Sequence, residues 1–309
     1  MLYTQTCSQT ETMGQKMLKR ILNKIDWYKR ILLTSFGVKR AYQINNYSIQ
    51  IDFNHRLPDY QRDNPFYDRF LPHLVKYLPD NTLVIDVGAN VGDTLVGMLG
   101  NNDRLEYFCI EASDDFFADL KKNVQSLKAQ NAQLQISIVN EFVGRDITDV
   151  GLDGQGGTKH AVVGGGNIKS KTMISILSDL AVEHSRLSLL KTDVDGFDWD
   201  VIRSSYEVLK HNPYVYFECQ YDNLEQLESY RELFSEMVAI GYSKFAFFDN
   251  YGQFILSTDN LTEVGELLDY VKRQNFHNST RTYFYYHVLA YLTDKSVETA
   301  LIIAKYNIR

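Results

Sequence analysis

The sequence predicts an α/β protein built on a doubly wound, mostly parallel sheet. Short apolar segments ending in an acidic residue alternate with helical segments between residues 83 and 240, a pattern typical of a parallel sheet covered by helices. Of the 309 residues, 44% are hydrophobic and 23% are charged, the composition of an ordinary globular protein. No repeat with a period of about 20–50 residues is present, which excludes a solenoid.

The elements before the sheet are an amphipathic helix, a strand region and a second helix. Residues 16–33 place apolar side chains at helical spacing opposite lysines and arginines, which predicts a helix. Alternation over residues 42–53 indicates strands, and residues 66–78 are expected to form a helix that closes at Pro79.

The sheet itself follows in chain order. We predict strands at residues 83–87, 105–111, 135–140, 187–193 and 214–218, and helices at residues 94–99, 115–127, 201–209 and 224–240. Residues 245–248 and 253–256 are expected to form an antiparallel hairpin at one edge of the sheet. Residues 261–309 are expected to be mostly helical, with their aromatic side chains used for packing. The chain is therefore divided into a basic arm (1–45), a central domain (46–260) and a helical C-terminal extension (261–309).

Charge is distributed unevenly along the chain. The net charge is -7, from 32 basic and 39 acidic residues. Residues 1–40 carry eight basic and two acidic residues, a charge of +6, so the remaining 269 residues carry -13. An acidic body argues against nucleic acid as a partner, because proteins that bind it usually present a basic face.

The basic helix at residues 16–33 has three open interpretations. It packs on its own domain, contacts a second subunit in a homodimer, or makes peripheral contact with an anionic membrane surface. Packing against protein is favoured, since most such apolar stripes face a core.

Cysteine usage and hydropathy point to a cytoplasmic protein, peripheral at the inner face of the membrane if the helix binds lipid. Cys7, Cys109 and Cys219 are an odd number without paired spacing, which argues against a disulfide framework or zinc site. No apolar run reaches the roughly 18–20 residues that cross a bilayer, and the first residues do not resemble a secretory signal.

The segment from Asp86 to Thr94 (DVGANVGDT) carries the strongest chemical signal. It follows the first sheet strand directly and opens a helix. Gly88 permits dihedrals closed to other residues and lets a ligand approach the backbone, while Gly92 allows close packing of helix on strand. Asn90, at the middle position, is the residue next most tolerant of left-handed dihedrals. The spacing differs from that of dinucleotide-binding loops and P-loops.

Glu111 is the second signal. It lies 25 residues after Asp86, again at the carboxyl end of a strand, where an acid commonly accepts hydrogen bonds from ribose hydroxyls. Together the two signals indicate an adenosine-type ligand above the strand ends, held without a pyrophosphate clamp.

Acidic residues also stand at the ends of the fourth and fifth predicted strands. Asp198 and Asp200 are expected to cap the helix after them. Asp193 belongs instead to the strand end that overlooks the ligand, with Asp195 just beyond, and Glu218 ends the next strand in the same manner. If these strands are parallel neighbours, their carboxylates face one cleft.

Taken together, these segments resemble the FkbM-type family of S-adenosylmethionine-dependent methyltransferases. The resemblance covers about residues 50–260 and implies a Rossmann-like, class I methyltransferase fold. The segments that carry it are Asp86–Thr94, Glu111, Lys191–Phe197 and Tyr216–Glu218, with Thr172–Leu180 before the fourth strand and His55–Pro58 and Tyr67–Asp68 upstream, the last two similar to elements of sugar-related members.

The resemblance implies S-adenosyl-L-methionine as cofactor. Glu111 would hold its ribose, and Ala112-Ser113 stands where the family often has a proline-containing turn. Residues at the third strand's end would lie near the adenine. The cofactor-binding residues expected are Asp86, Gly88, Ala89, Asn90, Gly92, Asp93, Thr94, Glu111, Ala112, Asn140, Glu141, Phe142 and Asp193.

The predicted activity is methyl transfer to a hydroxyl of a sugar or glycan precursor. An alcohol is a weak nucleophile and needs its proton removed during in-line attack. Asp193 is the first candidate for the base or orienting group, followed by Asp195 and Glu218. The same acids could instead hold a divalent cation. No histidine or aspartate is spaced to settle this question, so metal dependence stays open, with no metal as the favoured interpretation. We expect the scattered histidines to serve surface or packing roles.

Three alternatives stay open at this stage. The acceptor could be a small molecule other than a sugar, namely a macrolide, lipid or amine, and the chain could be a cofactor-binding scaffold without turnover. The glycine-rich segment at residues 151–166 is interpreted equally well as a plain hairpin or as a flap over the acceptor.

Overall fold

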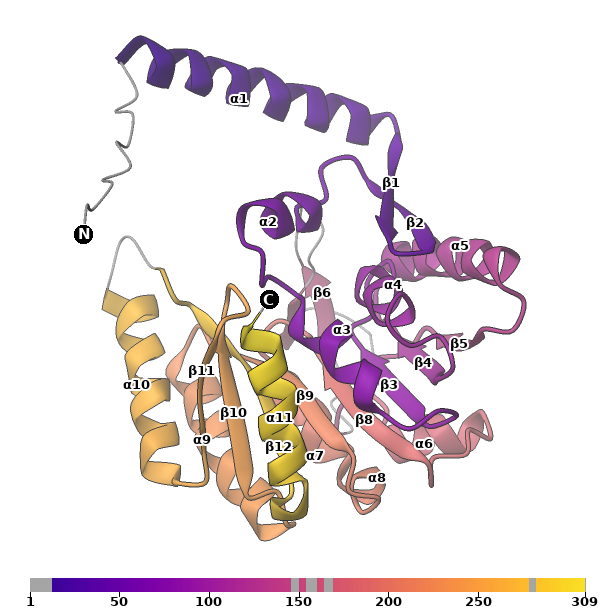
Figure 1. Ribbon diagram of the computed structural model, residues 1–309, viewed down its shortest axis with the longest axis vertical. Helices are drawn as coiled ribbons and strands as arrows, with labels where there is room; N and C mark the ends of the chain where they lie inside the picture. Colours follow the sequence, from indigo (N-terminus) through magenta and orange to yellow (C-terminus); the bar gives the residue numbers. More distant parts are fainter. Residues whose placement is uncertain (1–12, 146–149, 154–159, 164–168, 278–281, 309) are drawn as a thin grey trace, which may run out of the picture.

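The computed structural model shows a sheet between two layers of helices (Figure 1). It describes residues 13–145, 150–153, 160–163, 169–277 and 282–308. The parallel strands of the sheet are β3 (Leu83–Val87), β4 (Glu106–Ile110), β5 (Gln135–Val139), β8 (Leu187–Thr192) and β9 (Tyr214–Gln220). Three further strands pair antiparallel with their neighbours: β10 (Lys244–Asp249) with β11 (Phe254–Thr258) and β12 (Tyr285–Tyr291), and β12 with β9. Within the described residues the strand order is β11-β10-β12-β9-β8-β3-β4-β5, and the predicted doubly wound sheet is confirmed.

Each face of the sheet has its own apolar core, because successive residues of a strand point to opposite faces. One core packs under α3 (Phe70–Leu74), α4 (Asp93–Leu99), α5 (Asp114–Gln130), α11 (Ser296–Asn307) and the hairpin of β1 (Lys39–Ile44) and β2 (Tyr47–Asp52). The other packs under α6 (Met173–Asp179), α7 (Asp198–Ser204), α8 (Tyr206–Leu209), α9 (Leu224–Ala239) and α10 (Leu261–His277). The short turns η1 (Val75–Tyr77) and η2 (Thr293–Lys295) precede β3 and α11.

The C-terminal region differs from the expectation of mostly helix. Helices α10 and α11 are present, but the aromatic run between them forms β12, which lies between β10 and β9. All seven residues of β12 are buried, so the strand lacks the polar–apolar alternation by which a half-exposed strand is detected. The predicted edge hairpin is confirmed as β10 and β11.

The predicted N-terminal helix is α1 (Met13–Ser35), and it stands away from the sheet (Figure 1). Its contact with the body includes an ion pair between Arg30 and Asp59 of α2 (Leu57–Asp63). The expectation that its apolar stripe packs on its own domain is wrong, because the side chains of that stripe are 48–66% exposed: Met17, Ile21, Leu22, Ile25, Tyr28 and Leu32. Among the described helices, none combines the length and apolar character needed to cross a membrane.

Part of the glycine-rich segment forms an antiparallel pair, β6 (Val150–Asp153) with β7 (His160–Val163). The glycines at 154, 156, 157, 164, 165 and 166 lie outside the described residues. Both interpretations of this segment, a plain hairpin and a flap over the acceptor, therefore stay predictions.

Candidate functional site

The segment after β3 forms a tight turn into α4. Gly88 has φ +73°, and a Cβ at this position would lie 2.0 Å from the carbonyl oxygen of Asp193. Glycine is therefore required by both conformation and space. Asn90 (φ 49°) and Gly92 (φ +91°) are also left-handed, which confirms the backbone conformation predicted for Asn90. The turn thus places Gly88 directly against Asp193, the first residue of the loop that follows β8.

A buried ion pair lies beneath this turn. The Nζ of Lys191, on β8, is 2.9 Å from Oδ1 of Asp86, on β3, and Lys191 also donates to the carbonyl oxygen of Gly88 at 3.0 Å. Burial disfavours the charged ammonium, but the carboxylates of Asp86 and Asp193 outweigh it and raise the pKa of Lys191. Asp86 thus supports the turn through Lys191, a lysine whose role the sequence analysis did not assign although it interrupts an apolar strand.

Glu111 holds the same turn from the other side. Its two carboxylate oxygens accept hydrogen bonds from the backbone N–H groups of Asn90 (2.8 Å) and Ser113 (2.7 Å). The backbone N–H of Ala89 donates to the carbonyl oxygen of Ile110 at 3.1 Å. Each carboxylate oxygen keeps a further lone pair, so the position expected for a ribose contact is compatible with the observed hydrogen bonds.

The residues expected beside the adenine are linked to Glu111 or to one lysine. The Asn140 side-chain amide donates to the carbonyl oxygens of Glu111 (2.9 Å) and Ala112 (3.2 Å). The Nζ of Lys171 lies 2.7 Å from Glu141, and its backbone N–H donates to the carbonyl oxygen of Phe142 at 2.8 Å. The loop after β5 is thus fixed next to the glycine turn.

A cleft of about 480 Å³ opens above the ends of β3, β8 and β9. It brings together seven of the residues predicted from the sequence, from both the cofactor-binding and the catalytic sets: Gly88, Asn90, Asp93, Thr94, Asp193, Asp195 and Glu218. The other lining residues come from the region of α2, from the end of β9 and from the C-terminal part of the chain: His55, Arg56, Leu57, Tyr60, Tyr67, Asp68, Gln220, Asn250, Tyr251, Phe284 and Tyr285.

The three candidate catalytic acids differ in environment. The side chain of Asp193 is 40% exposed. Burial, together with the nearby carboxylate of Asp193, raises the pKa of Asp195 to about 7. Glu218 is buried, and burial together with Asp193 and Asp195 raises its pKa well above the usual range. Its Oε1 has no hydrogen-bond partner. Asp193 is thus more open than Glu218.

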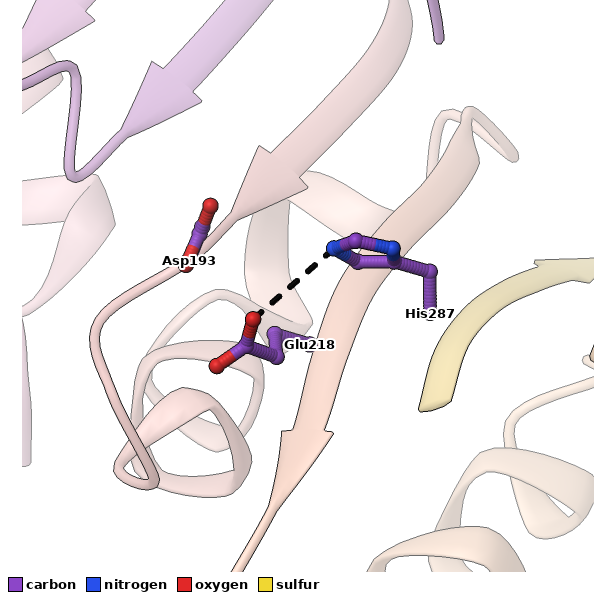
Figure 2. Close-up of side chains that lie close together, drawn as sticks. All are labelled: Asp193, Glu218 and His287. Atoms are coloured by element: carbon purple, nitrogen blue, oxygen red, sulfur yellow. Dashed lines mark ion pairs between the residues drawn. The ribbon is translucent and has the colours of Figure 1, made fainter. Parts of the chain in front are cut away.

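His287 joins these acids, which the sequence analysis missed. Figure 2 shows Asp193, Glu218 and His287 directed toward one another from the loop after β8, from β9 and from β12. The Nε2 of His287 is 3.8 Å from Oε2 of Glu218, and burial lowers the pKa of His287 to about 4. The expectation of a surface or packing role stays a prediction for this histidine, whose buried ring stacks on Tyr216 while it lies beside two candidate acids. Only the pairing register of β12 and β9, which sets His287 opposite Glu218, would have revealed it.

Asp198 and Asp200 do not cap α7 as expected, since the N-cap position belongs to Phe197. Asp198 instead accepts a hydrogen bond from the Thr192 hydroxyl at 2.9 Å, and Asp200 accepts one from Arg145 Nε at 2.7 Å. Both acids are buried. Asp198 thus fixes the loop that carries Asp193 and Asp195, whereas Asp200 holds the segment at Arg145.

Comparison with known proteins supports the resemblance. A family model described as "Methyltransferase FkbM domain" matches residues 86–277. The chain belongs to this family. It is an S-adenosylmethionine-dependent methyltransferase of the class I fold.

Solved structures of similar fold share little sequence with this enzyme. The FkbM methyltransferase from Methylobacillus flagellatus KT is 11% identical, with a TM-score of 0.37, over 76% of this chain and 59% of that one. The precorrin-6y C5,15-methyltransferase from Geobacter metallireducens GS-15 is 10% identical, with a TM-score of 0.38, over 72% and 86% of the two chains. No curated protein matches the chain.

Replacing Gly88 with alanine is expected to disrupt the cofactor turn. The added Cβ would meet the Asp193 carbonyl oxygen and displace either the turn or the β8 loop. We expect the cofactor dissociation constant, measured by calorimetry, to rise at least about tenfold, a loss of about 1.4 kcal/mol.

Gly37→Ala is the matched control, because Gly37 has a similar φ of +68° but no atom within 4 Å of the added Cβ. It should lower the free energy of unfolding by about 1–2 kcal/mol through backbone strain alone and leave cofactor binding intact. Equal cofactor affinity in the two variants would show that the close approach at Gly88 is unimportant.

Proposed function

We propose that this enzyme transfers a methyl group to a hydroxyl of a sugar or glycan precursor. The supporting observation is the lining of the cleft, which combines the rings of Tyr67, Tyr251 and Tyr285 with the polar side chains of Asp68 and Asn250. A sugar offers apolar ring faces to aromatic side chains and hydroxyl edges to carboxylates and amides. Burial raises the pKa of Tyr67 well above the usual range, so its hydroxyl stays protonated.

In this proposal the cofactor lies along the glycine turn. Glu111 binds the ribose, and the loop at Asn140–Phe142 borders the adenine. Five carboxylates line the cleft, those of Asp68, Asp93, Asp193, Asp195 and Glu218. A negative potential of this kind favours a cofactor with a cationic sulfonium.

The acids also suit the acceptor hydroxyl. The side chain of Asp193 is 40% exposed and lines the cleft, and we assign it first as the group that orients or deprotonates the hydroxyl. Asp195, with its pKa raised to about 7 by burial and Asp193, is suited to accept a proton near neutral pH. The methyl carbon must lie in line between the acceptor oxygen and the sulfur.

The test is incubation with methyl-labelled S-adenosylmethionine and a panel of glycans, nucleotide sugars, macrolides, lipids and amines, followed by location of the label by mass spectrometry. Label on a sugar hydroxyl supports the proposal. Label on another class of acceptor would reassign the substrate, and cofactor binding without transfer to any panel member would favour the scaffold alternative.

Replacing Asp193 with asparagine is expected to abolish most turnover while cofactor binding stays near that of the wild type. Loss of a general base or orienting carboxylate costs about 10²–10⁴-fold in rate. Turnover is measured with the labelled cofactor and binding by calorimetry. Asp80→Asn is the matched control, because its carboxylate is 41% exposed and lies before β3, at the opposite end of the strand. If D193N turns over as fast as D80N, Asp193 has no catalytic role.

We propose further that α1 makes peripheral contact with an anionic membrane surface. Its apolar stripe is exposed, and the helix carries six basic residues against one acidic residue. Two copies of such a helix would repel each other in a dimer, whereas anionic lipids attract it by about 1 kcal/mol per basic residue. An acceptor attached to a lipid would be reached at the same surface.

Charge reversal on this helix should release the enzyme from lipid. Lys24 and Lys29 are exposed, and the double variant K24E/K29E is expected to weaken co-sedimentation with phosphatidylglycerol-containing vesicles by at least about 30-fold. Pure phosphatidylcholine vesicles serve as the control surface. A protein that forms a stable dimer in solution and binds neither kind of vesicle would contradict the proposal. That result would favour contact of α1 with a second subunit.

A further inference from the structure

Three side chains of metal-binding type meet where Asp193 and Glu218 line the cleft, with His287 beside them. Asp193 follows β8, Glu218 lies in β9 and His287 lies in β12 (Figure 2). One ligand atom from each lies within 4.8 Å of the other two. Because β12 runs antiparallel to β9 with His287 opposite Glu218, this convergence is fixed by the sheet.

The spacing is close to that of a metal site. Nitrogen and oxygen ligands bind first-row divalent cations at about 2.0–2.2 Å, so two ligands of one ion lie at most about 4.4 Å apart. The Nε2 of His287 and Oε2 of Glu218, at 3.8 Å, meet this limit. Asp193, with a side chain 40% exposed, has room to turn by the few tenths of an ångström still required.

The imidazole is held in a fixed orientation. Its ring stacks on Tyr216 with centroids 5.4 Å apart and planes 21° apart, and the ring of Tyr285 meets it edge-on at 5.2 Å. A ligand ring that is oriented before the ion arrives loses little freedom on binding. Aromatic packing therefore positions His287 for coordination.

A second observation favours a cation at this cluster. Glu218 is only 6% exposed, and its Oε1 has no hydrogen-bond partner. A buried carboxylate oxygen without a partner is costly. The nearby Lys191 is 3.9 Å from Asp193 but forms its closer ion pair, at 2.9 Å, with Asp86. Lys191 thus pairs mainly with Asp86 and leaves Oε1 of Glu218 without a partner.

We propose that Asp193, Glu218 and His287 bind one first-row divalent cation of the Mn²⁺ type. Two carboxylates supply the hard oxygen donors that Mn²⁺ accepts, and the imidazole favours a transition metal over Mg²⁺ or Ca²⁺. Three protein ligands leave coordination positions open for water or for a hydroxyl from the cleft. The sequence leaves metal dependence open for want of a placed histidine or aspartate, and β12 supplies the histidine.

The use of this cation in catalysis rests on the proposed function. The acceptor hydroxyl would bind the ion, which lowers the pKa of the hydroxyl. Its O–H bond breaks and the proton passes to a cleft carboxylate such as Asp195. The oxygen forms a bond with the methyl carbon as the carbon–sulfur bond breaks, leaving S-adenosylhomocysteine and an unchanged ion. Asp193 then acts as a ligand that holds the hydroxyl in place.

The test is a titration of untagged, chelator-treated protein with Mn²⁺ alone, followed by electron paramagnetic resonance and calorimetry. We expect one Mn²⁺ per chain. H287Q should weaken binding at least about tenfold, since loss of even an outer-shell partner costs 10–100-fold. D193N should weaken it similarly, and its partly exposed side chain keeps the result interpretable if H287Q fails to fold.

His211→Gln is the control, since His211 is exposed and lies beyond α8, before β9 begins. It should bind Mn²⁺ as the wild type does. A wild-type chain that binds no Mn²⁺, or H287Q and D193N that bind it equally well, would overturn the site. Methyl transfer that persists in chelator with no Mn²⁺ bound would overturn the metal and leave the proposed function standing, whereas Mn²⁺ binding without any methyl transfer would keep the site and remove its catalytic use.

Discussion

The buried pair of Lys191 and Asp86 is the interaction on which the site depends. A charge that is buried must be paired and hydrogen-bonded, and Lys191 meets this need with Asp86 on the neighbouring strand and with the carbonyl oxygens of Val87 and Gly88. These contacts hold the carboxyl ends of β3 and β8 together and fix the turn that leads from β3 into α4. The close approach of Gly88 to Asp193 follows from the same geometry, so the glycine turn and the loop that carries Asp193 are fixed against each other.

The antiparallel strand β12 adds a second constraint. A parallel sheet alone would place only the carboxyl ends of its strands at the cleft. Because β12 runs in the opposite direction between β10 and β9, its N-terminal half reaches the same edge and brings Tyr285 and His287 beside Glu218. The C-terminal region therefore supplies part of the site as well as part of the sheet.

The sequence predicted what local patterns determine. Buried parallel strands are continuous apolar runs, so β3 to β9 and the turn at Gly88 could be located. His287 could not, because its proximity to Glu218 depends on pairing between strands about 70 residues apart, which local periodicity does not encode. Amphipathicity predicted α1 but not what its apolar face contacts, since the same stripe suits a core, a partner or a membrane. Lys191 was visible only as a lysine inside an apolar strand.

Charge in the cleft also bears on the acceptor. The described lining holds five carboxylates but a single arginine, Arg56, whose guanidinium lies 5.6 Å from the ring centre of Tyr60. A bound sulfonium and a divalent cation would neutralise part of this charge, and both would lie near the strand ends. An acidic group on the acceptor would be repelled from the remaining carboxylates and attracted to Arg56. The charges of the cleft would therefore suit an acceptor whose reacting end, near Asp193, is neutral. Any negative charge on that acceptor would lie at the Arg56 end.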